Sequence, residues 1–110
     1  MNLLFVCSRN QWRSPTAERL FARHNGVKCR SAGTGRQARR TVRREDLNWA
    51  DLVFVMEQHH KQRLKELFPQ ELRSCEVHVL DVPDEYGFMD PDLVELLEGA
   101  VGPILDSIGP

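Results

Sequence analysis

The chain is organised around one stretch of nine residues, Cys7-Ser8-Arg9-Asn10-Gln11-Trp12-Arg13-Ser14-Pro15. The apolar run before it, residues 2–6, is typical of a buried strand. The residues after it have the apolar spacing of a helix, with Ser14 suited to the N-cap and Pro15 to the first helical position. The sequence therefore predicts a cysteine at the end of a strand, an arginine six positions later and a helix that begins at once.

This strand-to-helix turn is a predicted anion-binding site. A tight loop of this kind points backbone N–H groups inward, and the positive end of the helix dipole adds to them. Arg13 can grip two phosphate oxygens with its guanidinium group. Such surroundings favour the thiolate of a cysteine, so Cys7 is a candidate nucleophile. The alternative is that Cys7 is a small buried hydrophobic residue, which is common for cysteine.

The order of these residues closely resembles the phosphate loop of the low-molecular-weight protein tyrosine phosphatase family. That loop has a cysteine, five residues, an arginine and a serine, usually followed by proline, with asparagine at the fourth position. The matching residues are Cys7, Asn10, Arg13, Ser14 and Pro15. Neither of the other two cysteines is followed by an arginine at this spacing.

The resemblance continues along nearly the whole chain on a shortened frame. Ser31-Ala32-Gly33-Thr34 is similar to the segment that follows the family's second strand, and residues 49–56 resemble the third strand and its approach. Val82-Pro83-Asp84-Glu85-Tyr86 resembles the family's Asp-Pro-Tyr segment, with Glu85 in place of proline. Longer members place an extra loop, which walls the substrate cleft, in the region that is brief here between Thr34 and Asp51.

The resemblance implies a metal-independent phosphomonoester hydrolase, a protein tyrosine phosphatase that acts through a phosphocysteine. Cys7 would attack phosphorus, and Arg13 would bind the equatorial oxygens and their transition-state charge. Asp84 would protonate the leaving oxygen, with Asp81 as the rival. Tyr86 would line the substrate cleft together with a residue of the loop, Trp12. The residues expected to bind phosphate are Ser8, Arg9, Asn10, Gln11, Trp12, Arg13 and Ser14.

Three residues of the loop carry further expectations. Asn10 tolerates a left-handed backbone, which would help to curl the loop. Ser14 could cap the helix and also donate its hydroxyl to the Cys7 thiolate. Trp12 stands where many family members have a second cysteine, and Arg9 stands where many have glycine. The resemblance therefore does not determine the substrate specificity.

Strands alternate with helices along the chain. We expect strands at residues 2–6, 27–31, 51–56 and 75–80, and helices at about 15–24, 42–50, 57–68 and 92–108. This pattern predicts a single α/β domain over residues 1–110, a three-layer sandwich whose central sheet has about four parallel strands and helices on both faces. Leu47 and Trp49 should point inward. The last helix should carry one apolar face, made of Leu93, Leu96, Leu97, Ala100, Val101, Ile104, Leu105 and Ile108.

Composition narrows the function classes. The net charge is −1 and the hydrophobic fraction is 41%, which fits a soluble globular protein. No apolar run approaches the ~20 residues that cross a bilayer, and no signal-peptide pattern is present. Three widely spaced cysteines argue for a reducing compartment, so we expect a cytoplasmic protein. Five arginines between Arg36 and Arg44 form either a solvated face or a surface that steers anions, and nothing resembles a nucleic-acid reader.

The expected ligand is a phosphotyrosine-containing protein or a small phosphomonoester, with phosphate, sulfate or vanadate able to occupy the loop. No metal or cofactor is expected, because the pair His59-His60 points in different directions on a helix. Two rivals remain. One is a catalytically silent phosphate- or phosphopeptide-binding module. The other is a thiol-dependent arsenate reductase, which would need two further cysteines close together, whereas Cys29 and Cys75 lie far apart.

Overall fold

Four parallel strands form the centre of the molecule in a computed structural model that describes residues 1–108. The strands are β1 (Asn2–Cys7), β2 (Lys28–Gly33), β3 (Leu52–Val55) and β4 (Glu76–Val79), in the sheet order β2-β1-β3-β4. Their registers pair Leu3 of β1 with Cys29 of β2 and Leu52 of β3, and Leu52 with Glu76 of β4. The predicted parallel α/β fold is confirmed.

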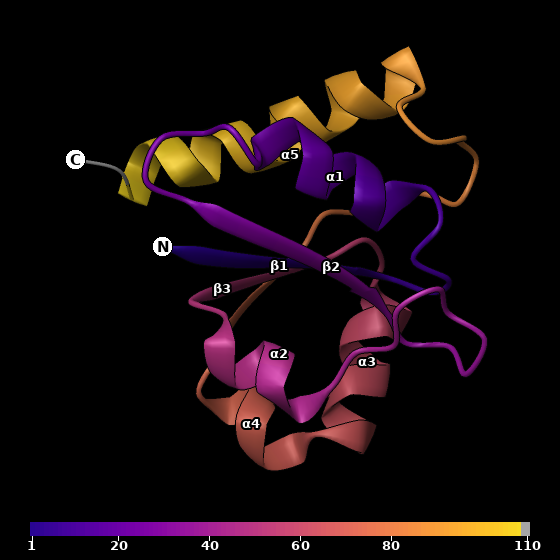
Figure 1. Cartoon of the computed structure of the whole chain (residues 1–110), viewed down its shortest axis with the longest axis vertical. Coiled ribbons are helices and arrows are strands. Elements are labelled where there is room, and N and C mark those ends of the chain that lie inside the picture. The colour runs from indigo at the N-terminus through magenta and orange to yellow at the C-terminus, as the bar shows by residue number, and fades with distance from the viewer. Residues whose placement is uncertain (109–110) are drawn as a thin grey trace.

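Helices cover both faces of this sheet, as Figure 1 shows. On one face lie α1 (Arg13–Phe21) and α5 (Pro91–Ile108). On the other lie α2 (Arg44–Trp49), α3 (Gln58–Leu67) and α4 (Pro69–Arg73). None of the helices in the described part of the chain is both long enough and apolar enough to span a membrane.

The apolar run of β1 explains the two layers. Successive side chains of a strand point to opposite faces, so Leu3, Phe5 and Cys7 join the core beneath α1 and α5, while Leu4 and Val6 join the core beneath α2, α3 and α4. All five are at most 3% exposed. A strand buried on both faces has no polar face to alternate with, and this is why residues 3–7 are continuously apolar.

Helix α1 begins earlier than predicted. Its N-cap is Trp12, which makes no side-chain capping bond, and its first residue is Arg13. Ser14 therefore lies inside the first turn, and the prediction that it caps the helix is wrong. The physical reason is that the Ser14 hydroxyl is engaged at Cys7 instead. The helix start is held by Thr16, whose backbone N–H and hydroxyl both donate to the Trp12 carbonyl oxygen.

Three smaller differences concern burial and helix ends. The sequence did not predict α4, a short helix that begins at Pro69 directly after α3. Trp49 is only half-buried, because the Arg30 guanidinium lies over its ring at 4.1 Å rather than apolar core. The apolar stripe of α5 is narrower than expected, since Leu96 and Ile108 are 42% and 39% exposed. Its fully buried residues are Leu93, Leu97, Val101 and Leu105.

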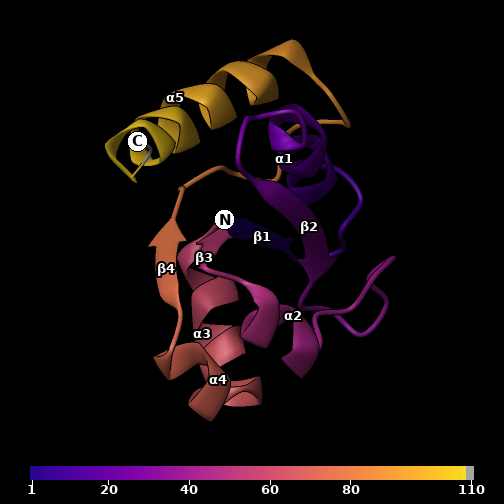
Figure 2. The same ribbon diagram turned by 60° about the vertical axis from the view of Figure 1, so that its left-hand side comes forward.

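All four strands run in the same direction, so their carboxyl ends meet at one edge of the sheet. Figure 2 shows β2 and β4 at the two sides of the sheet, with β1 and β3 between them. Cys7 ends β1, one of the two inner strands, and the segment after β4 returns across the same end. Ligands of open α/β sheets bind at this end, which is where the predicted loop lies.

Candidate active site

Cys7 lies at the edge of a small cavity of about 40 Å³. Six of its lining residues belong to the predicted phosphate loop, and the seventh comes from the segment after β4. They are Cys7, Ser8, Arg9, Gln11, Trp12, Arg13 and Asp84. The structure thus brings together residues 77 positions apart in the chain, and the cavity is of the size of a single small anion.

The sulfur of Cys7 receives polar contacts from two residues of the loop. Its Sγ lies 3.3 Å from the donating backbone N–H of Asn10 and 3.0 Å from the Ser14 hydroxyl. Asn10 adopts the left-handed backbone expected for it, with φ at 56°, and this turns its N–H back toward the sulfur. Two donors aimed at one sulfur atom stabilise a thiolate more than a neutral thiol.

A chain of hydrogen bonds orients the Ser14 hydroxyl toward the sulfur. The Asn10 side-chain amide donates to Ser14 Oγ and to Ser31 Oγ, both at 2.9 Å, and the Ser31 hydroxyl donates to the Glu18 carboxylate. Because Ser14 Oγ already accepts from Asn10, its own hydrogen can be donated to Cys7 Sγ at 3.0 Å, which is nearer than its other acceptor, the Ala32 carbonyl oxygen at 3.5 Å. Asn10 and Ser14 are fully buried and lie behind the cavity rather than on its wall. Sequence reasoning assigned no role to Ser31 or Glu18.

The arginine-rich segment after β2 supports the loop from outside. The backbone N–H groups of Thr34, Gly35 and Arg39 donate to the carbonyl oxygens of Cys7, Ser8 and Arg9, each at 2.9 Å. The Arg39 side chain also donates to the Asn10 carbonyl at 3.0 Å.

Gly33, at the end of β2, permits this close approach. A Cβ there would lie 2.6 Å from both the Ser8 carbonyl oxygen and the Ala38 Cβ. Arg39 is exposed, in agreement with a solvated face, and its side chain also supports the loop through the Asn10 carbonyl.

Arg13 is only 3% exposed, and its guanidinium is fixed by groups from two other segments. Its Nη1 donates to Glu57 Oε1 at 2.5 Å and to the Val82 carbonyl at 2.8 Å. The bond from Arg13 is the main reason that the pKa of Glu57 is held below its ordinary value. Both bonds leave from Nη1, so the other nitrogens of the group keep hydrogens for an anion in the cavity. The sequence did not reveal this role of Glu57.

The two candidate acids occupy different positions. Asp84 lines the cavity, and its Oδ1 lies 3.8 Å from Arg13 Nε. Asp81 is exposed with φ at 56°, and it is not among the cavity-lining residues. The placement therefore favours Asp84 as the group that could reach a leaving oxygen.

The two predicted cleft aromatics are separated. Trp12 lines the cavity and is 46% exposed, so it stands at the rim. Tyr86 is half-buried, packs against the core beneath α1 and α5, and lines a different hollow beside α5. The structure does not bring Tyr86 to the cavity, because residues 86–90 turn toward the start of α5 instead.

The other two cysteines are poor nucleophiles in their surroundings. Burial, and next the charge of Glu18, raise the pKa of Cys29 to about 11. Burial also raises the pKa of Cys75. At neutral pH both remain thiols, which leaves Cys7 as the reactive candidate among the three.

His60 lies beneath the loop and is fully buried. Its Nδ1 accepts the Glu57 backbone N–H at 3.0 Å, and its Nε2 lies 2.8 Å from Ser8 Oγ. Burial, followed by the charges of His59 and Arg13, lowers the pKa of His60 to about 3. This buried histidine was not among the predicted site residues. The only signal in the sequence was its position three residues after Glu57, next to His59.

This buried histidine predicts acid sensitivity. An unfolded chain binds a proton at His60 below pH ~6.5, whereas the folded protein does not until about pH 3. Stability is therefore fully present above pH 6.5 and is lost as pH falls toward 3, at about 1.4 kcal/mol per pH unit. Urea denaturation should give a free energy of unfolding about 2 kcal/mol lower at pH 5 than at pH 7. His60→Asn should remove most of this difference, and an equal slope in both proteins would contradict the assignment.

Glu57, His59 and His60 bring three potential metal-binding atoms within 4.8 Å of one another. The prediction that His59 and His60 point in different directions is wrong, because their ring centroids lie 4.0 Å apart, and the sequence did not indicate that Glu57 would join them. Glu57 Oε1 already accepts from Arg13, and both ring nitrogens of His60 are hydrogen-bonded. A metal would have to displace these bonds, so the absence of a catalytic metal stays our prediction.

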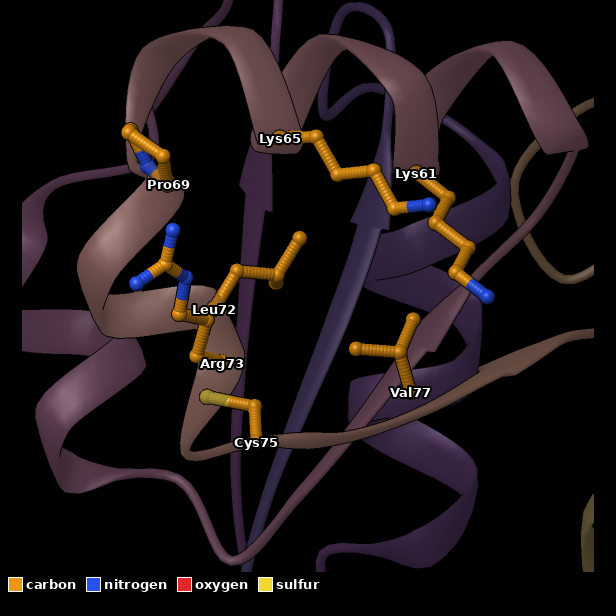
Figure 3. A pocket seen from close by; sticks show the side chains of 7 residues that line it. All are labelled: Lys61, Lys65, Pro69, Leu72, Arg73, Cys75 and Val77. Atoms are coloured by element: carbon orange, nitrogen blue, oxygen red, sulfur yellow. The ribbon is translucent and has the colours of Figure 1, made fainter.

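A larger cavity of about 360 Å³ lies elsewhere, between α3, α4 and β4. Figure 3 shows the side chains of Lys61, Lys65 and Arg73 around an apolar floor of Leu72 and Val77. Since these residues lie near the amino end of β4, this cavity is at the opposite end of the sheet from Cys7. It is not part of the phosphate loop.

The strand, loop and helix around Cys7 form a candidate anion-binding site centred on a cysteine. The family profile described as low molecular weight phosphotyrosine protein phosphatase matches residues 2–45. The chain is 36% identical to the low molecular weight protein-tyrosine-phosphatase Wzb of Escherichia coli K12 over 94 residues, covering 63% of each.

Solved structures share the fold. One of the tyrosine phosphatase Wzb from Escherichia coli K30, in complex with phosphate, has a TM-score of 0.81 at 23% identity and covers 98% of both chains. Another, of the YwlE arginine phosphatase from Geobacillus stearothermophilus, has a TM-score of 0.77 at 22% identity, covering 97% of this chain and 92% of that one.

The chain is thus similar to the low molecular weight phosphotyrosine protein phosphatase family over part of its length, and it shares the fold of that family's solved structures. It spans 63% of the length of the curated relatives that it matches.

Proposed function

We propose that this protein is a metal-independent phosphomonoester hydrolase that acts on protein phosphotyrosine through a phosphocysteine intermediate. The observation that carries the proposal is the cavity at Cys7, which holds the sulfur, the fixed Arg13 guanidinium and the Asp84 carboxyl group together. A nucleophile, a cationic clamp and a proton donor are the groups that phosphoryl transfer from an ester to a thiolate requires.

The reaction follows from these groups in two steps. The Cys7 thiolate attacks phosphorus, the ester P–O bond breaks, and its electron pair leaves on the alcohol oxygen, which takes a proton from Asp84. Water then attacks the phosphocysteine, Asp84 takes its proton, and inorganic phosphate and the thiolate are released. Arg13 and the loop N–H groups bind the equatorial oxygens, where charge collects in both transition states.

Two features support an aromatic ester. The cavity of about 40 Å³ has room for a phosphoryl group but not for the rest of a substrate. Trp12, a partly exposed aromatic residue at its rim, is of the type on which a phenyl ring can stack. We further propose that the loop binds phosphate, sulfate and vanadate, and that the protein works in a reducing cytoplasm, where Cys7 is not oxidised.

Relatives with the same fold include proteins described as tyrosine phosphatases and as an arginine phosphatase. A panel of peptides that carry phosphotyrosine, phosphoserine or phosphoarginine therefore tests the substrate class. We expect kcat/KM to be highest for phosphotyrosine, because only that residue presents a ring to Trp12. A preference for phosphoarginine would overturn the substrate assignment while leaving the thiol mechanism in place.

The arsenate reductase alternative does not suit the positions of the thiols. Cys29 lies on edge strand β2, and Cys75 directly precedes edge strand β4, at the opposite side of the sheet. Three strand spacings separate these edges, roughly 14 Å, so the two thiols cannot pair or relay electrons to Cys7 without unfolding. Arsenate-dependent oxidation of thioredoxin should be absent.

Turnover of para-nitrophenyl phosphate separates an enzyme from a silent phosphate-binding module. We expect hydrolysis that survives exhaustive treatment with EDTA, because backbone N–H groups and Arg13 can meet the transition-state charge without a cation. Rates before and after chelation are compared at saturating substrate. An inactive chelated sample that a divalent ion restores would contradict the mechanism, and phosphate binding without turnover would support the silent module.

A further inference from the structure

We propose that His60 is a positioning residue that holds the Ser8 hydroxyl so that its hydrogen is directed to a phosphate oxygen in the Cys7 cavity. This inference rests on the proposed function, because it takes the cavity to be occupied by a phosphoryl group. It assigns a role to a histidine that does not itself line the cavity and contacts a lining residue, Ser8.

The first step is the tautomer of His60. A backbone N–H can only donate, so the 3.0 Å contact from the Glu57 N–H requires an unprotonated Nδ1 on His60. The ring is fully buried and neutral, with its pKa lowered to about 3 by burial first. A neutral imidazole with a bare Nδ1 carries its hydrogen on Nε2.

The second step is the direction of the Ser8 hydroxyl. Ser8 Oγ lies 2.8 Å from His60 Nε2, and this nitrogen is the donor in the fixed tautomer. The hydroxyl of Ser8 therefore accepts from His60 and cannot donate to it. No other hydrogen bond of Ser8 Oγ is found among residues 1–108, so its hydrogen is free for a ligand. Ser8 lines both the cavity beside Cys7 and an open hollow that it shares with His59 and Arg63. The proposal directs the hydrogen to the Cys7 cavity, where the ligand would be phosphate.

The third step is the position of His60 at the start of α3. His60 is the third residue of this helix, and its bond to the Glu57 N–H is half of a capping box. The same turn carries the Glu57 carboxylate that anchors Arg13. The start of α3 thus fixes both Arg13 and Ser8. These two donors of the phosphate site belong to the loop and helix that follow β1. Preorganised donors of this kind raise affinity for the charged ligand without moving on binding.

A double-mutant cycle tests the proposal, with inorganic phosphate as the probe. Ser8→Ala removes the hydroxyl, and we expect the dissociation constant for phosphate to rise by about 10-fold or more, the effect of one hydrogen bond to a charged group. His60→Asn keeps an acceptor near the position of Nδ1, and so the helix cap, but has no donor that reaches Ser8. It should weaken phosphate binding by about 5–10-fold in the wild-type background and by less than about 2-fold in the Ser8→Ala background.

Three comparisons distinguish positioning from a merely structural role. His60→Gln places an amide donor near the position of Nε2 and should restore phosphate affinity to within about 3-fold of wild type. Ser8→Thr, which keeps a hydroxyl, should do the same. His24→Asn makes the same substitution at an exposed histidine at the end of α1 and should change nothing. If the effects of Ser8→Ala and His60→Asn simply multiply, His60 does not act through Ser8 and the proposal is wrong.

A measurement on the wild-type protein tests the tautomer of His60 even if a His60 variant does not fold. Long-range ¹H–¹⁵N correlation of the imidazole should show His60 neutral and protonated at Nε2, both free and with phosphate bound. An Nδ1–H tautomer or a charged ring at pH 7 would overturn the inference.

The outcomes also separate this inference from the proposed function. If Ser8 and His60 are coupled in a protein that binds phosphate but hydrolyses nothing, the proposed hydrolase function is wrong and the positioning role of His60 stands. If the protein hydrolyses phosphate esters but the two residues are not coupled, the positioning role is wrong and the hydrolase function stands. A wild-type protein that binds no phosphate would contradict both proposals.

Discussion

Replacing Cys7 with serine should abolish hydrolysis of para-nitrophenyl phosphate while phosphate and vanadate still bind. A serine hydroxyl at this position is a far weaker nucleophile than a thiolate, and among residues 1–108 no carboxylate or imidazole is hydrogen-bonded to the Cys7 side chain that it would replace. We expect a loss of at least ~10⁴-fold in kcat, the scale seen when a catalytic nucleophile is removed. Binding should survive because Arg13 and the loop remain, and calorimetry with phosphate measures it directly.

The other two cysteines provide matched controls for this change. Cys29→Ser and Cys75→Ser make the same substitution at thiols whose pKa values are raised by burial, Cys29 to about 11. Both variants should keep wild-type turnover. Iodoacetate at mildly acidic pH should modify Cys7 first, because its sulfur receives hydrogen bonds from Asn10 N–H and Ser14 Oγ. Equal labelling of all three cysteines would show that Cys7 has no special reactivity.

Asp84→Asn should have the next largest effect. An amide of the same shape cannot protonate the leaving oxygen, and removing a general acid typically costs ~10²–10⁴-fold in rate. Phosphotyrosine, whose leaving group is poor, should lose about 10²-fold or more. An aryl phosphate with a much better leaving group should lose less, since its oxygen needs little protonation. The measurement is kcat for a series of aryl phosphates that differ in the pKa of the phenol.

Asp81→Asn is the control for that experiment. Asp81 lies three residues before Asp84, is exposed, and has the left-handed backbone that asparagine adopts readily. The substitution should therefore leave both folding and rate nearly unchanged. An inactive Asp81→Asn together with a nearly normal Asp84→Asn would transfer the acid role to Asp81.

The sequence alone determined the local parts of this protein. The spacing from Cys7 to Arg13 between an apolar run and a helical pattern predicted the loop, because each of those signals depends on residues close together in the chain. The left-handed φ of Asn10 was likewise a property of the residue type. The alternation of strand and helix patterns was sufficient for the parallel sheet, since parallel strands require a crossover between them.

Prediction from the sequence failed where a local signal competed with a distant partner. Ser14 has the residue type of an N-cap, yet its hydroxyl serves Cys7, seven positions away, and the helix begins at Arg13 instead. Tyr86 comes two residues after Asp84, but its ring packs against the core beside α5 and does not line the cavity. Burial of the apolar ring on the core decides its position.

Only the tertiary structure decided which residues support the site. Glu57 reaches Arg13 across 44 positions, Ser31 reaches Asn10 across 21, and His60 reaches Ser8 across 52. These pairs depend on the strand order β2-β1-β3-β4, which places β2 and β3 on either side of β1 and so brings the segments that follow them to the loop. No pattern of spacing encodes such contacts, because the physical cause is the packing of the strands side by side.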